Sequence, residues 1–142
     1  MKNPVLETKS TYKGYPYVVL FMPGAYRCGY VGVPYSHKLA KKDVNDLGYL
    51  RCHGGVTYAE SHLYNCDDEN TWWIGFDCAH CFDGYDIELA KQYFGCNPRF
   101  EKTFSVAEDL WEKANKDPET EIRSLAYVKD ECKKLIDQIE KE

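Results

Sequence analysis

The final segment of the chain carries one apolar stripe of helical periodicity, and this stripe constrains the fold more than any other feature. Apolar side chains recur there at intervals of one, three and four residues, at Leu125, Val128, Cys132, Leu135, Ile136 and Ile139. Residues at this spacing share one face of an α-helix. We therefore predict a terminal amphipathic helix whose stripe is buried against another layer of the protein.

The first half of the chain is rich in β-branched and aromatic residues, which predicts the sheet that this helix would cover. Residues 15–22 form one such run, which ends at the turn pair Pro23-Gly24, and residues 26–33 form a second run. Glycine and proline at these points typically mark turns. We therefore predict that the two runs pair as a β-hairpin.

The most strand-like part of the chain is Thr71–Asp77. Successive side chains of a strand point to opposite faces. This alternation separates two sets, Trp72, Ile74 and Phe76 on one face and Trp73, Gly75 and Asp77 on the other. We assign the first set to the core. The second set combines a ring with a glycine and a carboxylate, which is typical of a pocket floor that a ligand approaches closely.

A glycine turn, Gly54-Gly55, is flanked by two further β-rich segments. These segments are residues 49–52 and residues 56–58. Paired glycines are common in the tight turns of hairpins. We therefore expect two short strands that meet at this turn.

The second half of the chain has a helical pattern. Residues 86–94 predict a short helix that ends at Gly95, and Ser105 with Glu108 is typical of a capping box that begins a helix through about Asn115. Together these segments predict an α+β fold. It would have a mostly antiparallel sheet in the N-terminal half, helices in the C-terminal half, and the terminal helix packed on the sheet.

Composition and charge exclude several classes of protein. The chain has 142 residues, of which 44% are apolar and 29% charged, so we expect one globular domain over residues 1–142. Its net charge of -5 offers no overall attraction for long nucleic acid, although a few local donors can still hold a small anion. We expect no membrane span, because no apolar run approaches about 20 residues. The first four residues lack the apolar stretch of a secretory signal, so we expect a cytoplasmic protein.

Seven cysteines are many for this length. Without an export signal we expect reduced thiols. The segment from Cys78 to Cys81 matches CxxC, so a structural zinc is an alternative, but no second CxxC accompanies it. A nucleophilic Cys78 near an imidazolium is a further alternative, which the opposite facing of Cys78 and Asp77 in an extended segment disfavours.

Two histidines are the centre of the candidate site. His53 precedes the glycine turn, and His80 lies midway between Asp77 and Asp83. If residues 77–83 coil as a helical turn, their spacing would put both carboxylates beside the imidazole and favour its charged form. A charged imidazole would hold a phosphate or carboxylate, whereas a neutral one would ligate a metal or accept a proton from water. We therefore predict that His53 and His80 face a common pocket.

Small and hydroxyl-bearing residues near His53 are further candidates. Gly54 and Gly55 can present successive amide N–H groups to an anion, and Thr57 and Tyr58 add hydroxyl groups. A hairpin turn uses the same pair of glycines for geometry alone, and this alternative stays open.

An aromatic ring and a cation complete the predicted pocket. Trp73 can stack on a base or a sugar, or it can pack under a covering helix. Arg123 and Arg27 can each supply the guanidinium fork that grips a phosphate, or they can be solvated surface charges.

Four motifs together resemble a group of small proteins encoded by tailed phages and prophages. They are Gly29-Tyr30-Val31-x-Val33-Pro34-x-x-His37, His53-Gly54-Gly55-Val56-Thr57-Tyr58, Trp72-Trp73-Ile74-Gly75-Phe76-Asp77-Cys78-Ala79-His80-x-x-Asp83, and Arg123 with Tyr127-Val128 and Glu131. The resemblance covers most of the chain from Gly29 to Ile139, except residues 88–118, and its long central motif is specific. It implies a phage setting and a shared polar cluster, but no particular reaction. This chain departs from the group in having Cys81-Phe82 before Asp83, where small residues are more usual.

The leading functional prediction is a binding module. Its pocket would capture a small anionic, nucleotide-like ligand, and the phage setting favours a host immune signal as that ligand, in the host cytoplasm. The residues expected to bind it are His53, Gly54, Gly55, Thr57, Tyr58, Trp73, Asp77, His80, Asp83 and Arg123. One alternative is a hydrolase of such a ligand, in which His53, Asp77 and His80 hold a metal or act as acid and base. Another is an inhibitor that contacts a host defence protein, and a homo-oligomer is also compatible with the sequence.

Overall fold

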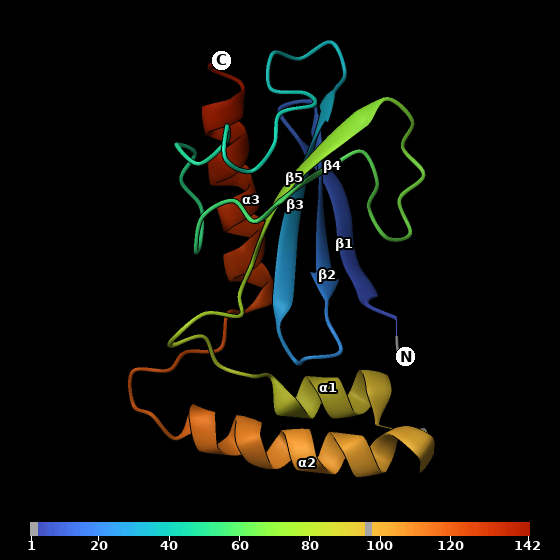
Figure 1. The fold of residues 1–142 in the computed structure, drawn as a ribbon, viewed down its shortest axis with the longest axis vertical. Coiled ribbons are helices and arrows are strands. Elements are labelled where there is room, and N and C mark those ends of the chain that lie inside the picture. Colours follow the sequence, from blue (N-terminus) through green and yellow to red (C-terminus); the bar gives the residue numbers. More distant parts are fainter. Residues whose placement is uncertain (1–2, 96–97) are drawn as a thin grey trace.

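The computed structural model describes residues 3–95 and 98–142, except the side chains of residues 98–105. Within these ranges one antiparallel sheet has the strand order β1-β2-β3-β5-β4 (Figure 1). Its strands are β1 (Val5–Tyr12), β2 (Tyr15–Phe21), β3 (Arg27–Pro34), β4 (Tyr58–Glu60) and β5 (Thr71–Asp77). The described helices are α1 (Ile87–Phe94), α2 (Pro98–Asn115) and α3 (Leu125–Ile139). The fold is therefore α+β, with the sheet in the N-terminal half and the helices in the C-terminal half, as the sequence predicts.

The predicted hairpin is formed by β2 and β3. Their register runs from Tyr17 opposite Val31 to Phe21 opposite Arg27. A second hairpin joins β1 to β2 through Lys13 and Gly14, which both have positive φ angles. Turns of this backbone type match the twist of the strands that they connect.

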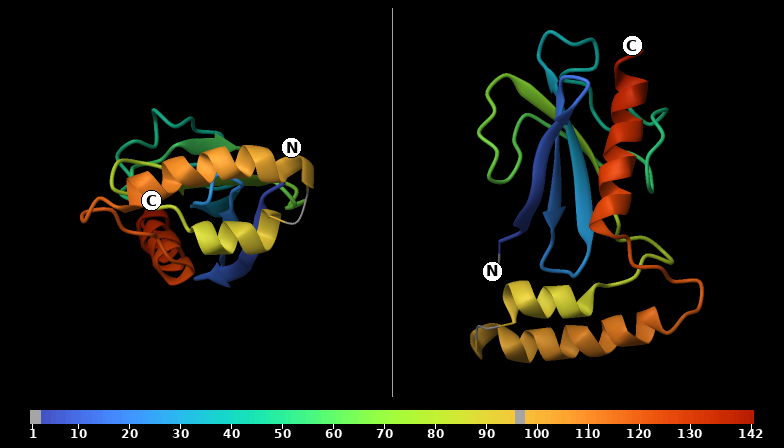
Figure 2. Two further views of the ribbon diagram at one scale, coloured as in Figure 1. Left: turned by 90° about the horizontal axis from the view of Figure 1, so that it is seen from below. Right: turned by 180° about the vertical axis from the view of Figure 1, so that it is seen from behind.

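The terminal helix α3 covers one face of the sheet (Figure 2). The predicted stripe is confirmed, because Val128, Cys132, Leu135, Ile136 and Ile139 are all buried. They pack with inward-facing residues of β2, β3 and β5, which include Val19, Val31, Ile74 and Phe76. Burying an aliphatic side chain of this size stabilises the fold by about 1.5–3 kcal/mol, so this interface is a main source of stability.

The opposite face of the sheet has its own core. Val18, Leu20, Tyr30 and Trp73 pack there under the connection between β4 and β5, which contributes Leu63 and Cys66. The two-sided alternation predicted for β5 is therefore confirmed, since Ile74 and Phe76 belong to the α3 side. Trp73, however, is 0% exposed. A loop of the chain covers its ring, and the expectation that it lines an open pocket is wrong.

Helices α1 and α2 lie across one end of the sheet (Figures 1 and 2). The predicted bounds of α1 are confirmed, because the Asp86 side chain accepts a hydrogen bond from the backbone N–H of Leu89 at the start and Gly95 caps the end. Phe94 packs on Phe21 of β2. The start predicted for the next helix is wrong, because α2 begins at Pro98 and Ser105 lies inside it. None of the helices in the described part of the chain is long and apolar enough to cross a membrane.

The predicted pairing of residues 49–52 with residues 56–58 is also wrong. Residues 49–52 form no strand, because Leu50 is buried in the α3-side core and the backbone of Arg51 bonds to a helix instead. The Arg51 N–H donates to Oε1 of Gln138 at 2.8 Å, and the Arg51 carbonyl accepts from Nε2 of Gln138 at 2.7 Å. Tyr58 begins β4, which pairs with β5.

Candidate functional site

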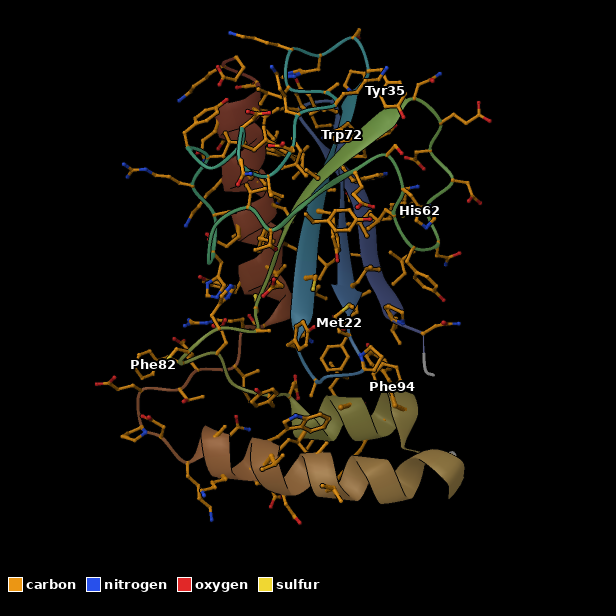
Figure 3. All side chains as sticks on the ribbon, in the orientation of Figure 1. Met22, Tyr35, His62, Trp72, Phe82 and Phe94 are labelled. Carbon is orange, nitrogen blue, oxygen red and sulfur yellow. The ribbon has the colours of Figure 1, made fainter. Side chains whose placement is uncertain are left out.

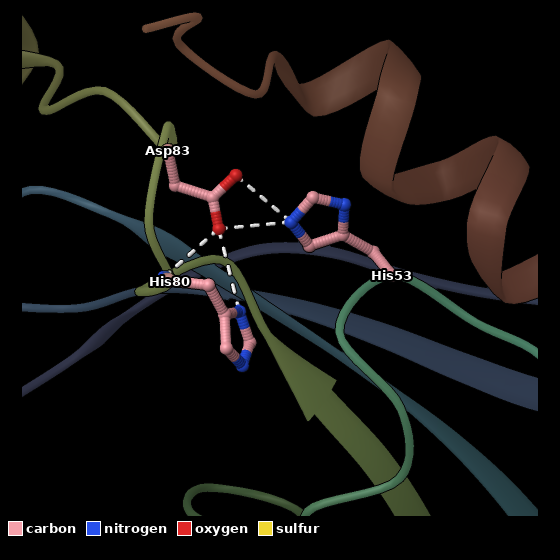
Figure 4. Close-up of side chains that lie close together, drawn as sticks. All are labelled: His53, His80 and Asp83. Atoms are coloured by element: carbon pink, nitrogen blue, oxygen red, sulfur yellow. Dashed lines mark hydrogen bonds and ion pairs between the residues drawn. The ribbon is translucent and has the colours of Figure 1, made fainter.

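Three segments that are distant in the sequence meet near the end of β5. They are the turn after Cys52, the loop that follows Asp77, and the start of α3 (Figure 3). The structure brings His53 and His80 together, with 5.8 Å between their ring centroids (Figure 4). The two imidazoles therefore share one site, as the turn signals around them suggest.

Asp83 is the residue that joins the three segments. Its side chain is 2% exposed and its two oxygens lie 2.9 and 2.8 Å from Nε2 of His53. The carboxylate also accepts from Nε of Arg123 at 2.9 Å and from the backbone N–H of His80 at 3.0 Å. Burial alone would raise the pKa of Asp83, but these hydrogen bonds outweigh it and hold the pKa below its ordinary value. Asp83 is therefore ionised at neutral pH.

The bond to Asp83 also determines the proton position on His53. A carboxylate only accepts hydrogen bonds, so Nε2 of His53 carries a proton. In the neutral ring, Nδ1 then accepts a hydrogen bond from the hydroxyl of Tyr127, which lies 2.8 Å away. Burial raises the pKa of Tyr127, so its hydroxyl keeps its proton. The result is a chain of hydrogen bonds from Tyr127 through His53 to Asp83.

His80 is the accessible member of the site, with 37% of its side chain exposed. Its Nδ1 atom lies 3.4 Å from Oδ2 of Asp83 and its Nε2 atom 3.6 Å from Oδ1 of Asp77. Asp77 is held in turn by the Thr57 hydroxyl and the backbone N–H of Ala79. The predicted pairing of His80 with both carboxylates is therefore present, around a turn in which the Asp83 N–H donates to the His80 carbonyl.

The two turn glycines have different surroundings. Both have positive φ angles, +70° at Gly54 and +84° at Gly55. A Cβ atom at Gly54 would lie 2.2 Å from Cε1 of His80, whereas one at Gly55 would meet nothing within 4 Å. Gly54 therefore makes room for the His80 ring. The Gly55 N–H donates to the Cys52 carbonyl at 3.0 Å, which corrects the expectation that this amide is presented to an anion.

Arg123 reaches the site from the residue before the N-cap of α3. It contacts Asp83 through Nε and Glu121 through Nη1, each at 2.9 Å. The hydrogen bond to Asp83 raises the pKa of Arg123. Arg27, the other candidate cation, is buried and paired with Glu7. Its Nη1 atom donates to the Arg123 carbonyl at 3.1 Å, so Arg27 positions the segment before α3 and is not a solvated surface charge.

Two predicted ligand residues lie away from this cluster. Trp73 is enclosed in the core on the other side of the sheet. Tyr58 packs edge-on against Tyr30 in the same core, and its hydroxyl donates to the His62 carbonyl. Strand alternation separates both rings from the side of α3, so they cannot contact a ligand held by His53.

Sequence reasoning did not place Glu121 or Tyr127 among the ligand residues, although Tyr127 belongs to one of the four motifs. Tyr127 follows Arg123 by four residues, and its ring packs edge-on to His53 and beside the Arg123 guanidinium. Residues spaced by four share one face of a helix. The same helical spacing that identifies the apolar stripe would therefore have indicated that these two residues lie together.

The described cysteines are free thiols, as expected. Cys78 is buried, and burial raises the pKa of its thiol, which disfavours the nucleophile alternative. Cys81 is exposed. The two ends of the CxxC segment thus occupy different environments, which disfavours a zinc ion held by both.

The donor atoms of His53, His80 and Asp83 lie within 4.8 Å of one another, close enough to hold a metal ion. Comparison with protein-family models, with curated proteins and with solved structures gives no significant match for this chain. The functional argument therefore depends on the geometry of the site. An accessible imidazole beside an ionised carboxylate can bind an anion when protonated, and it can exchange protons or ligate a metal when neutral.

Proposed function

We propose that the protein binds a small anionic, nucleotide-like ligand at the site formed by His53, His80, Asp83 and Arg123. The proposed setting is the cytoplasm of a phage-infected host cell, where removal of such a ligand would counter host defence. The observation that carries this proposal is the convergence of two imidazoles and a guanidinium from three segments, with His80 open to solvent.

The contacts within the site support this role. Asp83 orients His53 and Arg123 before any ligand arrives, so little side-chain entropy is lost on binding. Arg123 has five N–H donors, and the contacts with Asp83 and Glu121 use its Nε and Nη1 atoms. The carboxylates of Asp77 and Asp83 lie 3.6 and 3.4 Å from the two nitrogens of His80, so the exposed ring is held at the mouth of the site.

Hydrolysis of the same ligand is a second candidate function. It is favoured by the contact between His80 and Asp77, which orients an accessible imidazole through its Nε2 atom. An imidazole held in this way can take a proton from water and return it to a leaving group. Binding and hydrolysis share the same residues and differ in whether the ligand is released intact.

Calorimetric titration of the full chain with cyclic dinucleotides and ADP-ribose derivatives tests the proposal. We expect binding heat that His80→Ala abolishes and His62→Ala retains, because His62 is exposed and lies in the connection between β4 and β5 (Figure 3). Chromatography of the ligand after denaturation then separates the two candidates, since intact ligand indicates sequestration and products indicate hydrolysis. Absence of heat with every compound, in a folded protein, would contradict the proposal.

A further inference from the structure

We propose that His53, His80 and Asp83 form a binding site for a divalent transition-metal ion. The metal would be bound by Nε2 of His53, Nδ1 of His80 and Oδ2 of Asp83. Figure 4 shows that the Asp83 carboxylate lies between the two rings, which come from different loops.

The spacing of the three donor atoms fits a metal ion. A metal with bonds of about 2.1 Å places neighbouring donors about 3.0 Å apart at a right angle and about 3.4 Å apart at the tetrahedral angle. Oδ2 of Asp83 lies 2.8 Å from Nε2 of His53 and 3.4 Å from Nδ1 of His80. All three atoms lie within 4.8 Å of one another, so small side-chain movements would complete the geometry.

Each proposed ligand also has an outer partner of the kind that metal ligands have in proteins. The remaining nitrogen of His53 faces the Tyr127 hydroxyl at 2.8 Å, and the remaining nitrogen of His80 faces Asp77 at 3.6 Å. Oδ1 of Asp83 accepts from Arg123 at 2.9 Å. Such partners fix the orientation and the protonation state of the ligands. On metal binding the His53 proton would move from Nε2 to Nδ1, and the Tyr127 oxygen would change from donor to acceptor.

The charges around the site favour a cation. The site has three carboxylates: Asp77 contacts His80, and Asp83 and Glu121 contact the Arg123 guanidinium. With both imidazoles neutral, negative charge exceeds positive charge. A divalent cation would balance this excess and would provide the positive charge that an anionic ligand requires. This second role rests on the proposed function, whereas metal binding itself does not.

The donor set indicates the class of metal. Two imidazoles and one carboxylate suit Zn²⁺, Fe²⁺ or Co²⁺, whereas Mg²⁺ and Ca²⁺ prefer oxygen donors. Three protein ligands leave at least one coordination position for water or for an oxygen of a phosphate group. His80, whose side chain is partly exposed, would give solvent access to the bound ion.

Titration of the metal-free full chain with Co²⁺ tests the inference through the visible absorption of the bound ion. We expect one equivalent to bind and to be displaced by Zn²⁺. Loss of a ligand weakens binding more than loss of an outer partner, which costs 10–100-fold. We therefore expect His80→Ala to weaken the affinity at least about 100-fold, and His62→Ala to leave it unchanged. Circular dichroism checks that each variant is folded.

Three results would overturn the metal site. The first is the absence of a visible cobalt spectrum in the folded wild type. The second is a spectrum that both His80→Ala and His53→Gln retain. The third is an intense thiolate-to-cobalt band that Cys81→Ser removes, because it would assign the ion to the exposed thiol.

Ligand titrations with and without a chelator separate this inference from the proposed function. If the ligand still binds in the presence of the chelator, the metal does not hold the ligand, but the ligand site itself is retained.

Discussion

The two turn glycines provide a matched pair of substitutions that tests the geometry of the site. Alanine at either position destabilises the fold by roughly 1–2 kcal/mol, because both φ angles are positive and an L side chain is strained in this conformation. Only at Gly54 does the new Cβ collide, at 2.2 Å from Cε1 of His80 where ordinary contact begins at 3.4 Å. The ring would therefore have to retreat by about 1.2 Å, the difference between these two distances.

This retreat should change binding more than it changes stability. His80 is partly exposed, so its ring can swing toward solvent at a cost of about 0.5–1.5 kcal/mol. The free energies of unfolding of Gly54→Ala and Gly55→Ala should therefore agree within about 1.5 kcal/mol. Because Nδ1 of His80 would lose its position beside Asp83, metal affinity should fall about 10–100-fold in Gly54→Ala and stay close to the wild-type value in Gly55→Ala.

Urea denaturation followed by circular dichroism measures the stabilities, and the cobalt titration measures the affinities. The imidazole signals in NMR spectra report directly whether His80 has moved. The reasoning is refuted if the two variants bind metal equally well, or if the His80 signals are the same in both.

Three further predictions concern Tyr127, Trp73 and the cysteines. Tyr127→Phe removes the hydrogen bond to His53 and should cost about 1 kcal/mol in urea denaturation, with cobalt affinity lowered about tenfold; unchanged affinity would show that the hydroxyl does not orient the ring. Trp73→Phe removes a buried Nε1–H that has no partner among the described atoms. The gain from removing this unsatisfied donor offsets the loss of packing, so the free energy of unfolding should change by less than about 2 kcal/mol. Cobalt binding should stay the same. Iodoacetamide at pH 8 should modify exposed Cys81 well before Cys78, because burial raises the pKa of the Cys78 thiol; mass spectrometry gives the order, and faster modification of Cys78 would contradict its burial.

Periodic features were predicted well from the sequence. The stripe from Val128 to Ile139 identifies α3 because helical spacing gathers these residues on one face. Alternation along β5 correctly separates Ile74 from Trp73 for the same kind of reason, since a strand repeats every two residues. Local backbone geometry alone produces both patterns.

Two features that depend on contacts between distant segments were predicted wrongly. A tryptophan on the second face of a strand can contact either a ligand or another part of the chain. For Trp73 it is the loop of residues 61–70 that covers the ring. Residues 49–52 have β-forming side chains, but Gln138 of α3 takes the backbone hydrogen bonds of Arg51. Neither outcome is encoded in the nearby sequence.

The candidate site was predicted in part. Turn signals identify His53 and His80, and helical spacing relates Asp83 to His80. The ion pair between Asp83 and Arg123 depends on the path of the chain between α2 and α3. That path also pairs the Arg123 guanidinium with Asp83 and Glu121, which the sequence did not indicate.

The loop that leaves β5 and the segment that leads into α3 run side by side. Asp83 and Glu121 form a parallel bridge, in which the Gly84 N–H donates to the Glu121 carbonyl and the Glu121 N–H donates to the Phe82 carbonyl. The chain therefore departs for α1 and α2 and comes back at almost the same point. The two ends of this excursion are thus fastened together beside Asp83, so the backbone at the base of the site is held by its own hydrogen bonds.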